Sequence, residues 1–277
     1  MSSKKNDEWV SAVIIDDDSE EEIDKQEVFD IIPKKKGVIE EVIPEVVQKK
    51  KRNVQQPLKI CFNEDINIVE FGIDEAGRGP MFGRVYAGLA VLPKDDTFDH
   101  SLMKDSKKFH SKKKIEQVAE YIKQHAIAWA VEYEDEQTID DINILQATQS
   151  AMHKCIKNVL GQMKDLNIQN ILLLVDGNYF KPYSILNSSK TKVDYIKYQM
   201  VEGGDNKYTS IAAASILAKV ERDKYIEELC LQNPELVERY GIDSNKGYGS
   251  KKHMDGIKQY GITKWHRQTF GICKEYC

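Results

Sequence analysis

The sequence predicts an α/β protein with a mixed β-sheet flanked by helices, a helical C-terminal region and a disordered N-terminal tail. Three observations support this fold class. Short apolar runs alternate with amphipathic stretches after residue 57, as strands and helices do in α/β proteins. One later run, 170–175, is apolar almost throughout, as expected of a strand buried on both faces. Blocks of like charge fill residues 1–57, and such blocks resist packing.

The expected elements follow one another as strand, strand, helix, strand, helix, strand, strand, helix. We expect strands at 68–73, 85–92, 126–133, 170–175 and 197–201, and helices at 112–124, 139–161, 208–230 and, as a short one, 250–259. The first two strands are expected to be antiparallel and the later ones to be joined by crossovers, which predicts a mixed sheet. The apolar side chains of helix 139–161 that should pack inward are Ile142, Leu145, Met152, Ile156, Val159 and Leu160.

This pattern divides the chain into a tail (1–57), an α/β body (58–232) and a helical C-terminal region (233–277). The formal net charge is −5, and the tail holds 10 basic and 14 acidic residues against 30 and 31 in the remainder. The body is therefore nearly neutral, and any basic groove must be local. Short apolar patches in the tail are candidate sites for a protein partner, although we favour a disordered linker; its basic clusters resemble weak nuclear-import signals.

The cysteines and the hydropathy indicate where the protein works. Five scattered cysteines form no disulfide framework and no zinc spacing, which indicates a reducing compartment. No apolar segment reaches the length of a membrane span, and the N-terminus lacks a signal-peptide core. We therefore expect a soluble, monomeric, intracellular protein of the cytoplasm, or of the nucleus if the source is eukaryotic or viral.

Four carboxylates stand at or just after expected strand ends. Asp74 and Glu75 follow the first strand, Asp176 follows 170–175, and Asp205 lies just past 197–201. Four acids packed together repel one another unless cations neutralise them, and their hard oxygen ligands suit Mg²⁺ or Mn²⁺. Two such ions would suit in-line attack of water on a phosphodiester. Turn formation by Asp-Gly is the alternative for Asp176, and Asp74 and Glu75 share a face only if the strand has already bent.

Further residues suggest contacts to a nucleic acid. The turn Gly77-Arg78-Gly79 lets backbone approach a sugar closely, and Arg78 could hold a phosphate. Tyr248 lies between two glycines, where an aromatic ring can stack on a base or sugar. Each of these has a structural alternative, a surface arginine in a turn or a tyrosine at the edge of the core.

Two lysines and the histidines carry weaker signals. Lys107 could hold a phosphate or simply be solvated, and Lys219 sits four residues before Asp223, so a helical ion pair is its simplest explanation. The six histidines have no metal spacing, and we expect them to be surface or hydrogen-bonded groups.

In this combination the residues resemble ribonuclease HII, the type 2 ribonuclease H family, from about residue 68 to 271. The matching stretches are GIDEAGRGPMFG, DSKKF, IDDINILQAT, LLVDGN, SIAAASILAKVERD and GYGSKKHMDGIKQYGITKWHRQTF. The resemblance implies a ribonuclease H-like catalytic domain at 58–232 whose substrate site is completed by 233–277. Gly83-Arg84 and Thr263–His266 depart from the usual family pattern.

The resemblance also implies a function. The family hydrolyses the RNA strand of RNA/DNA hybrids and nicks DNA duplexes 5′ of embedded ribonucleotides, leaving 3′-hydroxyl and 5′-phosphate ends, and it requires Mg²⁺ or Mn²⁺. Asp74, Glu75, Asp176 and Asp205 match its catalytic, metal-binding acids, with Asp205 favoured over Asp223.

Substrate contacts carry over in the same way. Gly77, Arg78 and Gly79 match residues that read the ribose 2′-hydroxyl, and Tyr248 matches one that stacks at the ribonucleotide–DNA junction. Lys107 and Lys219 resemble positions near phosphates. The alternatives are a ribonuclease HIII-like enzyme that prefers longer RNA tracts, and a non-catalytic hybrid-binding protein of the same fold.

Overall fold

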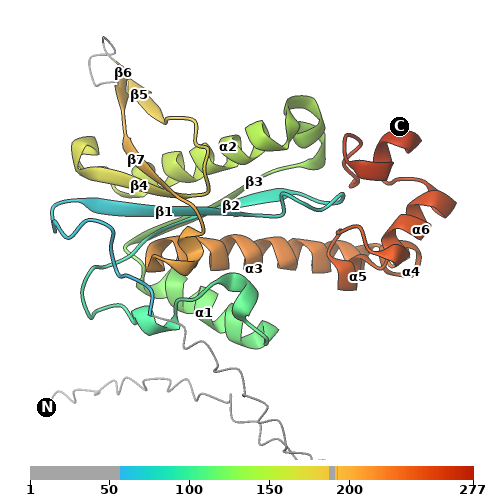
Figure 1. Cartoon of the computed structure of the whole chain (residues 1–277), viewed down its shortest axis with the longest axis horizontal. Helices are drawn as coiled ribbons and strands as arrows, with labels where there is room; N and C mark the ends of the chain where they lie inside the picture. The colour runs from blue at the N-terminus through green and yellow to red at the C-terminus, as the bar shows by residue number, and fades with distance from the viewer. Residues whose placement is uncertain (1–56, 187–190, 192) are drawn as a thin grey trace, which may run out of the picture. The chain divides into compact units, whose positions relative to one another are not determined.

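The computed structural model describes residues 57–186, 191 and 193–277. The tail predicted at 1–57 lies outside these residues, except for Pro57. A five-stranded mixed sheet organises the described part of the chain (Figure 1), with strand order β3-β2-β1-β4-β7. Its strands are β1 (Val69–Ala76), β2 (Val85–Val91), β3 (Ala128–Glu134), β4 (Ile171–Asp176) and β7 (Lys197–Val201).

The strand pairing agrees with the predicted mixed sheet. β1 is antiparallel to β2, and β2 is antiparallel to β3. β1 is parallel to β4, and β4 is parallel to β7. The carboxyl ends of β1, β4 and β7 therefore meet at one edge of the sheet, which is where α/β proteins place ligands.

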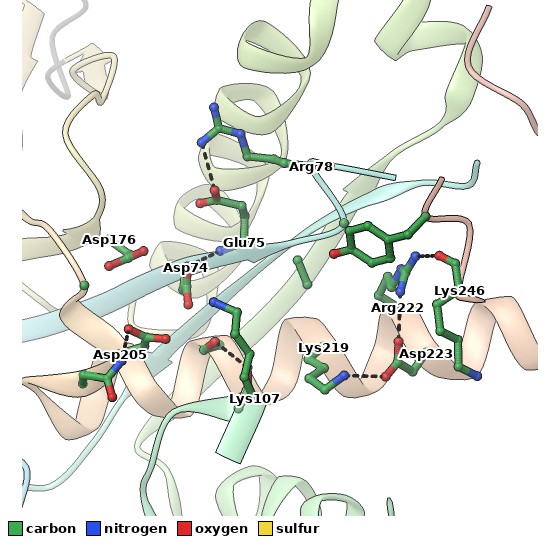
Figure 2. A pocket seen from close by; sticks show the side chains of 18 of the residues that line it. Asp74, Glu75, Arg78, Lys107, Asp176, Asp205, Lys219, Arg222, Asp223 and Lys246 are labelled. Atoms are coloured by element: carbon green, nitrogen blue, oxygen red, sulfur yellow. Dashed lines mark hydrogen bonds and ion pairs between the residues drawn. The ribbon is translucent and has the colours of Figure 1, made fainter. Parts of the chain in front are cut away.

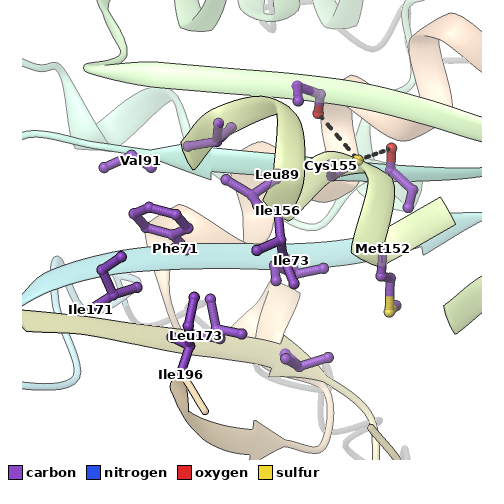
Figure 3. Close-up of a cluster of buried hydrophobic side chains, with 14 of the residues drawn as sticks. Phe71, Ile73, Leu89, Val91, Met152, Cys155, Ile156, Ile171, Leu173 and Ile196 are labelled. Carbon is purple, nitrogen blue, oxygen red and sulfur yellow. Dashed lines mark hydrogen bonds between the residues drawn. The ribbon is translucent and has the colours of Figure 1, made fainter. Parts of the chain in front are cut away.

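Helices cover both faces of the sheet. α2 (Glu136–Gln162) lies on one face, while α3 (Thr209–Gln232) lies on the other with α1 (Lys112–His125) packed outside it (Figure 1). The core between the sheet and α2 joins Phe71, Ile73 and Leu89 from the strands to side chains of the helix (Figure 3). Removing these apolar surfaces from water supplies the main driving force for folding this layer.

On the opposite face the backbone of α3 lies directly on the strands. A Cβ added at Gly72 would lie 2.2 Å from the carbonyl carbon of Ser210, and one added at Gly88 would lie 2.2 Å from the carbonyl oxygen of Ala214. Only glycine leaves room for this approach, and the alanines at 212–214 keep the helix face flat. The close contact fixes the position of α3, which continues to the edge where β1 and β4 end.

The C-terminal helices pack around the end of α3. α4 (Glu235–Tyr240), α5 (Ile242–Asn245) and α6 (Lys251–Tyr260) share a hydrophobic cluster with Met81 and Phe82, which follow β1. The helical C-terminal region is thus joined to the turn after β1. The remaining elements are the short hairpin strands β5 (Ser184–Leu186) and β6 (Val193–Tyr195) and the 3-10 helices η1 (His100–Leu102), η2 (Ser106–Lys108), η3 (Ile168–Asn170), η4 (Gly204–Asn206) and η5 (Gly271–Tyr276).

The structure corrects some details of the expected elements. β1 does not end at Ile73 but continues through both acids to Ala76, paired with β2. α2 contains a kink at Asn143, whose φ of 67° is not helical and whose side chain accepts a hydrogen bond from the Gln146 amide at 3.1 Å, as an N-cap does. Ile142, expected in the core, is 41% exposed, because it precedes this kink. Met152, Ile156 and Val159 are buried as predicted.

Candidate active site

A cleft of about 660 Å³ opens at the carboxyl ends of β1 and β4. Every site residue predicted from the sequence lines it: Asp74, Glu75, Gly77, Arg78, Gly79, Lys107, Asp176, Asp205, Lys219 and Tyr248. These residues span 175 positions of sequence and come from strands, turns, 3-10 helices and α3. Their convergence on one cleft is the central observation of the site.

Three of the acids come together because parallel strands end side by side. Asp74 lies near the end of β1 and Asp176 ends β4, while Asp205 lies in η4 just after β7 (Figure 2). Asp176 Oδ1 accepts a hydrogen bond from the Gly204 amide at 2.6 Å, which ties η4 to the end of β4. Asp205 is thereby brought next to Asp176.

Burial and mutual repulsion disfavour the charged forms of these acids. Asp74 is buried, and desolvation, followed by the charges of Glu75 and Asp176, holds its pKa well above the usual range. A hydrogen bond from Ser215 acts in the opposite direction. Burial also raises the pKa of Asp205, with smaller contributions from the nearby carboxylates. The cluster therefore carries an unfavourable excess of negative charge.

Glu75 reaches the cleft although β1 does not bend before it, as the sequence analysis had required. Asp74 and Glu75 are both still paired with β2, so their side chains leave opposite faces of the sheet. Pairing of β1 with β4 stops at Ile73, however, so β1 has a free edge beside both acids. Glu75 lies at that edge, with its carboxylate 3.0 Å from Arg78 Nη1 (Figure 2). Burial raises the pKa of Glu75, and Arg78 opposes that rise.

The donor set suits a hard divalent cation, although the side chains are not arranged around one. Among the residues described, no group of three or more histidine, cysteine, aspartate or glutamate side chains is positioned to hold a metal ion. Glu75 is engaged with Arg78 and Asp176 with the Gly204 amide. The donors themselves fit: all are carboxylate oxygens, the ligands that Mg²⁺ and Mn²⁺ prefer, and a cation would relieve the repulsion that raises the pKa of Asp74.

The turn after β1 lies beside the aromatic ring of the C-terminal region. Gly77 has a φ of +89°, which favours glycine, and a Cβ at Gly79 would lie 3.4 Å from the Tyr248 ring. The Tyr248 side chain is 52% exposed, and the Arg222 guanidinium lies 5.8 Å from its ring centre. Backbone and ring together form one wall of the cleft.

Cationic side chains also line the cleft. Lys107 lies in η2, which is capped by the Asp105 side chain, and its charge lowers the pKa of Glu75 and Asp205 (Figure 2). Lys219 Nζ pairs with Asp223 Oδ2 at 2.8 Å, so the predicted helical ion pair exists and also faces the cleft.

The sequence interpretation missed several residues of the cleft. On α3 it predicted Lys219, named Asp223 only as the ion-pair partner and the less favoured acid, and missed Ser215 and Arg222. All four lie on one face of the helix, at the spacing i, i+4, i+7, i+8. This polar stripe on a mostly buried helix is a signal that the sequence already contained. Asp223 pairs with Lys219 and Arg222 rather than with the acids, whereas Asp205 interacts with Asp176. The other cleft residues not predicted are Ala76, Ser106, Gly203, Asn206, Ser244, Asn245 and Lys246.

Comparison with known proteins identifies the family. The family model described as Ribonuclease HII matches residues 71–273. The chain belongs to the ribonuclease HII family. Ribonuclease HII of Parabacteroides distasonis is 42% identical over 207 residues, which cover 75% of this chain and 92% of that protein. Ribonuclease HII of Pelagibacter ubique is 41% identical over 199 residues, covering 72% and 94%.

Solved structures share the fold of this ribonuclease HII chain. The ribonuclease H2 from Pyrococcus horikoshii has a TM-score of 0.53 at 24% identity and covers 76% of this chain and 97% of that one. The RNase HII of Archaeoglobus fulgidus, solved with PCNA, has a TM-score of 0.54 at 23% identity and covers 74% of this chain and 96% of that one. Bst-RNase HIII, solved with Mn²⁺, has a TM-score of 0.55 at 17% identity and covers 76% of this chain and 69% of that one. The predicted ribonuclease H-like mixed sheet is confirmed.

Membership of the ribonuclease HII family supports ribonuclease activity, that is, hydrolysis of phosphodiester bonds by an enzyme of a class that binds RNA/DNA hybrids. None of the helices in the part of the chain that the structure describes combines the length and apolar character needed to cross a membrane. All five cysteines are free thiols, as their spacing predicted.

Proposed function

We propose that this chain hydrolyses the RNA strand of RNA/DNA hybrids and nicks DNA duplexes on the 5′ side of an embedded ribonucleotide, leaving 3′-hydroxyl and 5′-phosphate ends. One observation carries the proposal: the acids, the Gly77–Gly79 turn and Tyr248 line a single cleft. A carboxylate cluster supplies hydrolytic chemistry, and a backbone turn beside an aromatic ring supplies a surface that can distinguish ribose from deoxyribose.

Asp74, Glu75, Asp176 and Asp205 would hold Mg²⁺ or Mn²⁺, two ions during catalysis. Bound there, the ions supply a more acidic water for in-line attack and charge stabilisation of the leaving oxygen. The similarity to Bst-RNase HIII, which was solved with Mn²⁺, supports this assignment. To hold a cation, Glu75 would give up its contact with Arg78, which would leave Arg78 able to pair with a phosphate.

The remaining residues bind and orient the substrate. The backbone of Gly77, Arg78 and Gly79 would approach the 2′-hydroxyl, where an N–H or C=O can hydrogen-bond to it. Tyr248 would stack on the nucleotide beside the cleavage point. Lys107 and Lys219 would contact phosphates as point charges. We also propose that residues 233–277 complete this site, because Tyr248 and Lys246 come from them.

A partner for the tail 1–57 stays a prediction, as do the cytoplasmic or nuclear location and the monomeric state. The Archaeoglobus fulgidus relative was solved in complex with PCNA, which makes a protein partner a reasonable proposal for this chain as well.

Two substrates test the proposal, a DNA duplex with a single ribonucleotide and a long RNA/DNA hybrid. We expect Mg²⁺-dependent nicking of the first, cleavage of the second, and no turnover in EDTA. Asp176→Asn should abolish both activities while leaving the circular dichroism spectrum unchanged, whereas Asp165→Asn, an exposed control, should behave as wild type. Cleavage of the hybrid alone would favour a ribonuclease HIII-like enzyme. Tight hybrid binding without turnover would favour a non-catalytic protein.

A further inference from the structure

Arg267 holds the turn that forms the wall of the cleft, although it does not line the cleft itself. Its guanidinium donates to four backbone carbonyl oxygens: Nη2 to Gly77 at 2.6 Å, Nη1 to Arg78 at 3.0 Å and to Pro80 at 2.7 Å, and Nε to Gly83 at 2.8 Å. Two of the three turn residues whose backbone would meet the ribose, Gly77 and Arg78, therefore have their carbonyl groups held by this one side chain.

Arg267 lies in an environment that disfavours a charged side chain. The residue is fully buried, and it forms no ion pair with any residue that the structure describes. Burial, followed by repulsion from Arg222, lowers its pKa to about 10. A buried charge is tolerated when hydrogen bonds replace its hydration, and here carbonyl dipoles of the turn do so.

The C-terminal segment also runs alongside the turn. The Arg267 amide donates to the Met81 carbonyl at 2.8 Å, and the Gly83 amide donates to the Trp265 carbonyl at 2.9 Å. Phe82 and His266 form an antiparallel bridge between these contacts. The turn is therefore paired to residues 265–267 through the main chain, and Arg267 adds side-chain contacts from the same segment.

The same segment reaches Tyr248 through two buried histidines. The Thr263 amide donates to His266 Nδ1 at 2.9 Å, so the proton of the neutral ring lies on Nε2. That proton is donated to His253 Nε2 at 3.1 Å, which leaves His253 Nδ1 protonated and donating to the Tyr248 carbonyl at 2.9 Å. One chain of hydrogen bonds thus connects the residues next to Arg267 with the backbone of the stacking tyrosine.

We propose that Arg267 is a positioning residue that sets the geometry of the ribose-reading wall, with His266 and His253 extending its control to Tyr248. The role in catalysis rests on the proposed function, whereas the ordering of the turn does not. A rigid guanidinium fork can serve the four carbonyl groups together, and the point charge of a lysine cannot. Displacing the turn should slow the chemical step while contacts to phosphates, which dominate affinity for nucleic acid, persist.

The test is Arg267→Lys, compared with wild type and with Tyr240→Phe. Tyr240 is buried in the same C-terminal region, and its hydroxyl donates to the Gly261 carbonyl at 3.1 Å. Tyr240→Phe removes this hydrogen bond, at a cost in stability, and leaves the ring that packs against His266 in place. At a temperature where all three proteins are folded, we expect kcat of R267K on the single-ribonucleotide duplex to fall on the order of 100-fold with KM nearly unchanged. Y240F should keep the wild-type kcat.

Hydrogen exchange of the free protein gives a readout that does not depend on activity. The amides of residues 77–79 and 81–84 should exchange at least about tenfold faster in R267K than in wild type or Y240F, because local opening of the turn becomes easier. Folded R267K with wild-type kcat and unchanged exchange would overturn the proposal. If wild type itself does not nick, the proposed function fails, while faster exchange in R267K would still support the ordering role. If R267K does not fold, the same measurements are made on R267Q.

Discussion

Acidification should destabilise this protein through the buried histidine pair. His253 and His266 are 0% and 2% exposed, and their hydrogen bonds require both rings to be neutral. Burial, followed by the neighbouring His253, lowers the pKa of His266 to about 3, and burial also lowers the pKa of His253. In the unfolded chain a histidine accepts a proton near its ordinary pKa of about 6.5. Stability is therefore complete above that value and is lost as the pH falls below it.

The magnitude follows from the difference between the two pKa values of His266. Between the folded and unfolded pKa the free energy of unfolding changes by about 1.4 kcal/mol per pH unit for each such group. For His266 alone, this linkage gives a loss of about 2 kcal/mol between pH 7 and pH 5. His253 adds a loss of the same sign. A typical domain is stable by only about 5–15 kcal/mol, so the effect is large enough to measure.

Urea unfolding at pH 7, 6 and 5 measures this loss in wild type and in His266→Asn. The asparagine oxygen can still accept from the Thr263 amide but does not titrate. Its variant should lose about 2 kcal/mol less than wild type between pH 7 and pH 5. Groups whose pKa is raised in the folded protein, such as Asp74, add to its stability as the pH falls. This contribution is the same in both proteins, so it cancels when their losses of stability are compared. His110→Gln, at an exposed site, is the control; an equal loss in wild type and His266→Asn would refute the reasoning.

Three further predictions concern the cleft. Gly77→Ala should lower the free energy of unfolding in urea by on the order of 1–3 kcal/mol and should reduce nicking. The φ of Gly77 is +89°, and the new Cβ would lie 2.9 Å from the Arg84 carbonyl oxygen. A variant as stable as wild type would contradict this. Lys107→Met should reduce the slope of log K against log salt for hybrid binding by about 1, and an unchanged slope would exclude a phosphate contact. Tyr248→Ala should weaken binding by about 1–3 kcal/mol while Tyr248→Phe binds as wild type, and equal loss in both would argue against stacking.

The sequence predicted the elements that carry a continuous apolar run or an amphipathic pattern. β2 and β4 are runs of mostly buried residues, α1 buries one face, and the positions of the predicted strands and long helices agree with the structure to within a few residues. The hairpin of β5 and β6 was missed because Leu186, Val193 and Tyr195 are exposed, so no buried face imposes an alternation. The kink at Asn143 was missed because a single residue with positive φ that caps the second part of the helix leaves the surrounding apolar pattern nearly intact.

In the site, residues that follow a recognisable side-chain pattern could be predicted, whereas residues that act through backbone contacts could not. The convergence of Asp74 and Asp176 could be predicted because each follows an apolar run, and parallel pairing of β1 with β4 then places them at one edge. Arg267 could not be predicted in this way, because its partners are carbonyl oxygens that every residue carries. The two buried histidines lie 13 residues apart, a spacing that has no meaning until the chain folds. Residues that act on the backbone of a site therefore leave weaker sequence signals than the residues that they position. Here they lie in the C-terminal segment, and Arg267 is more than 180 residues from the turn.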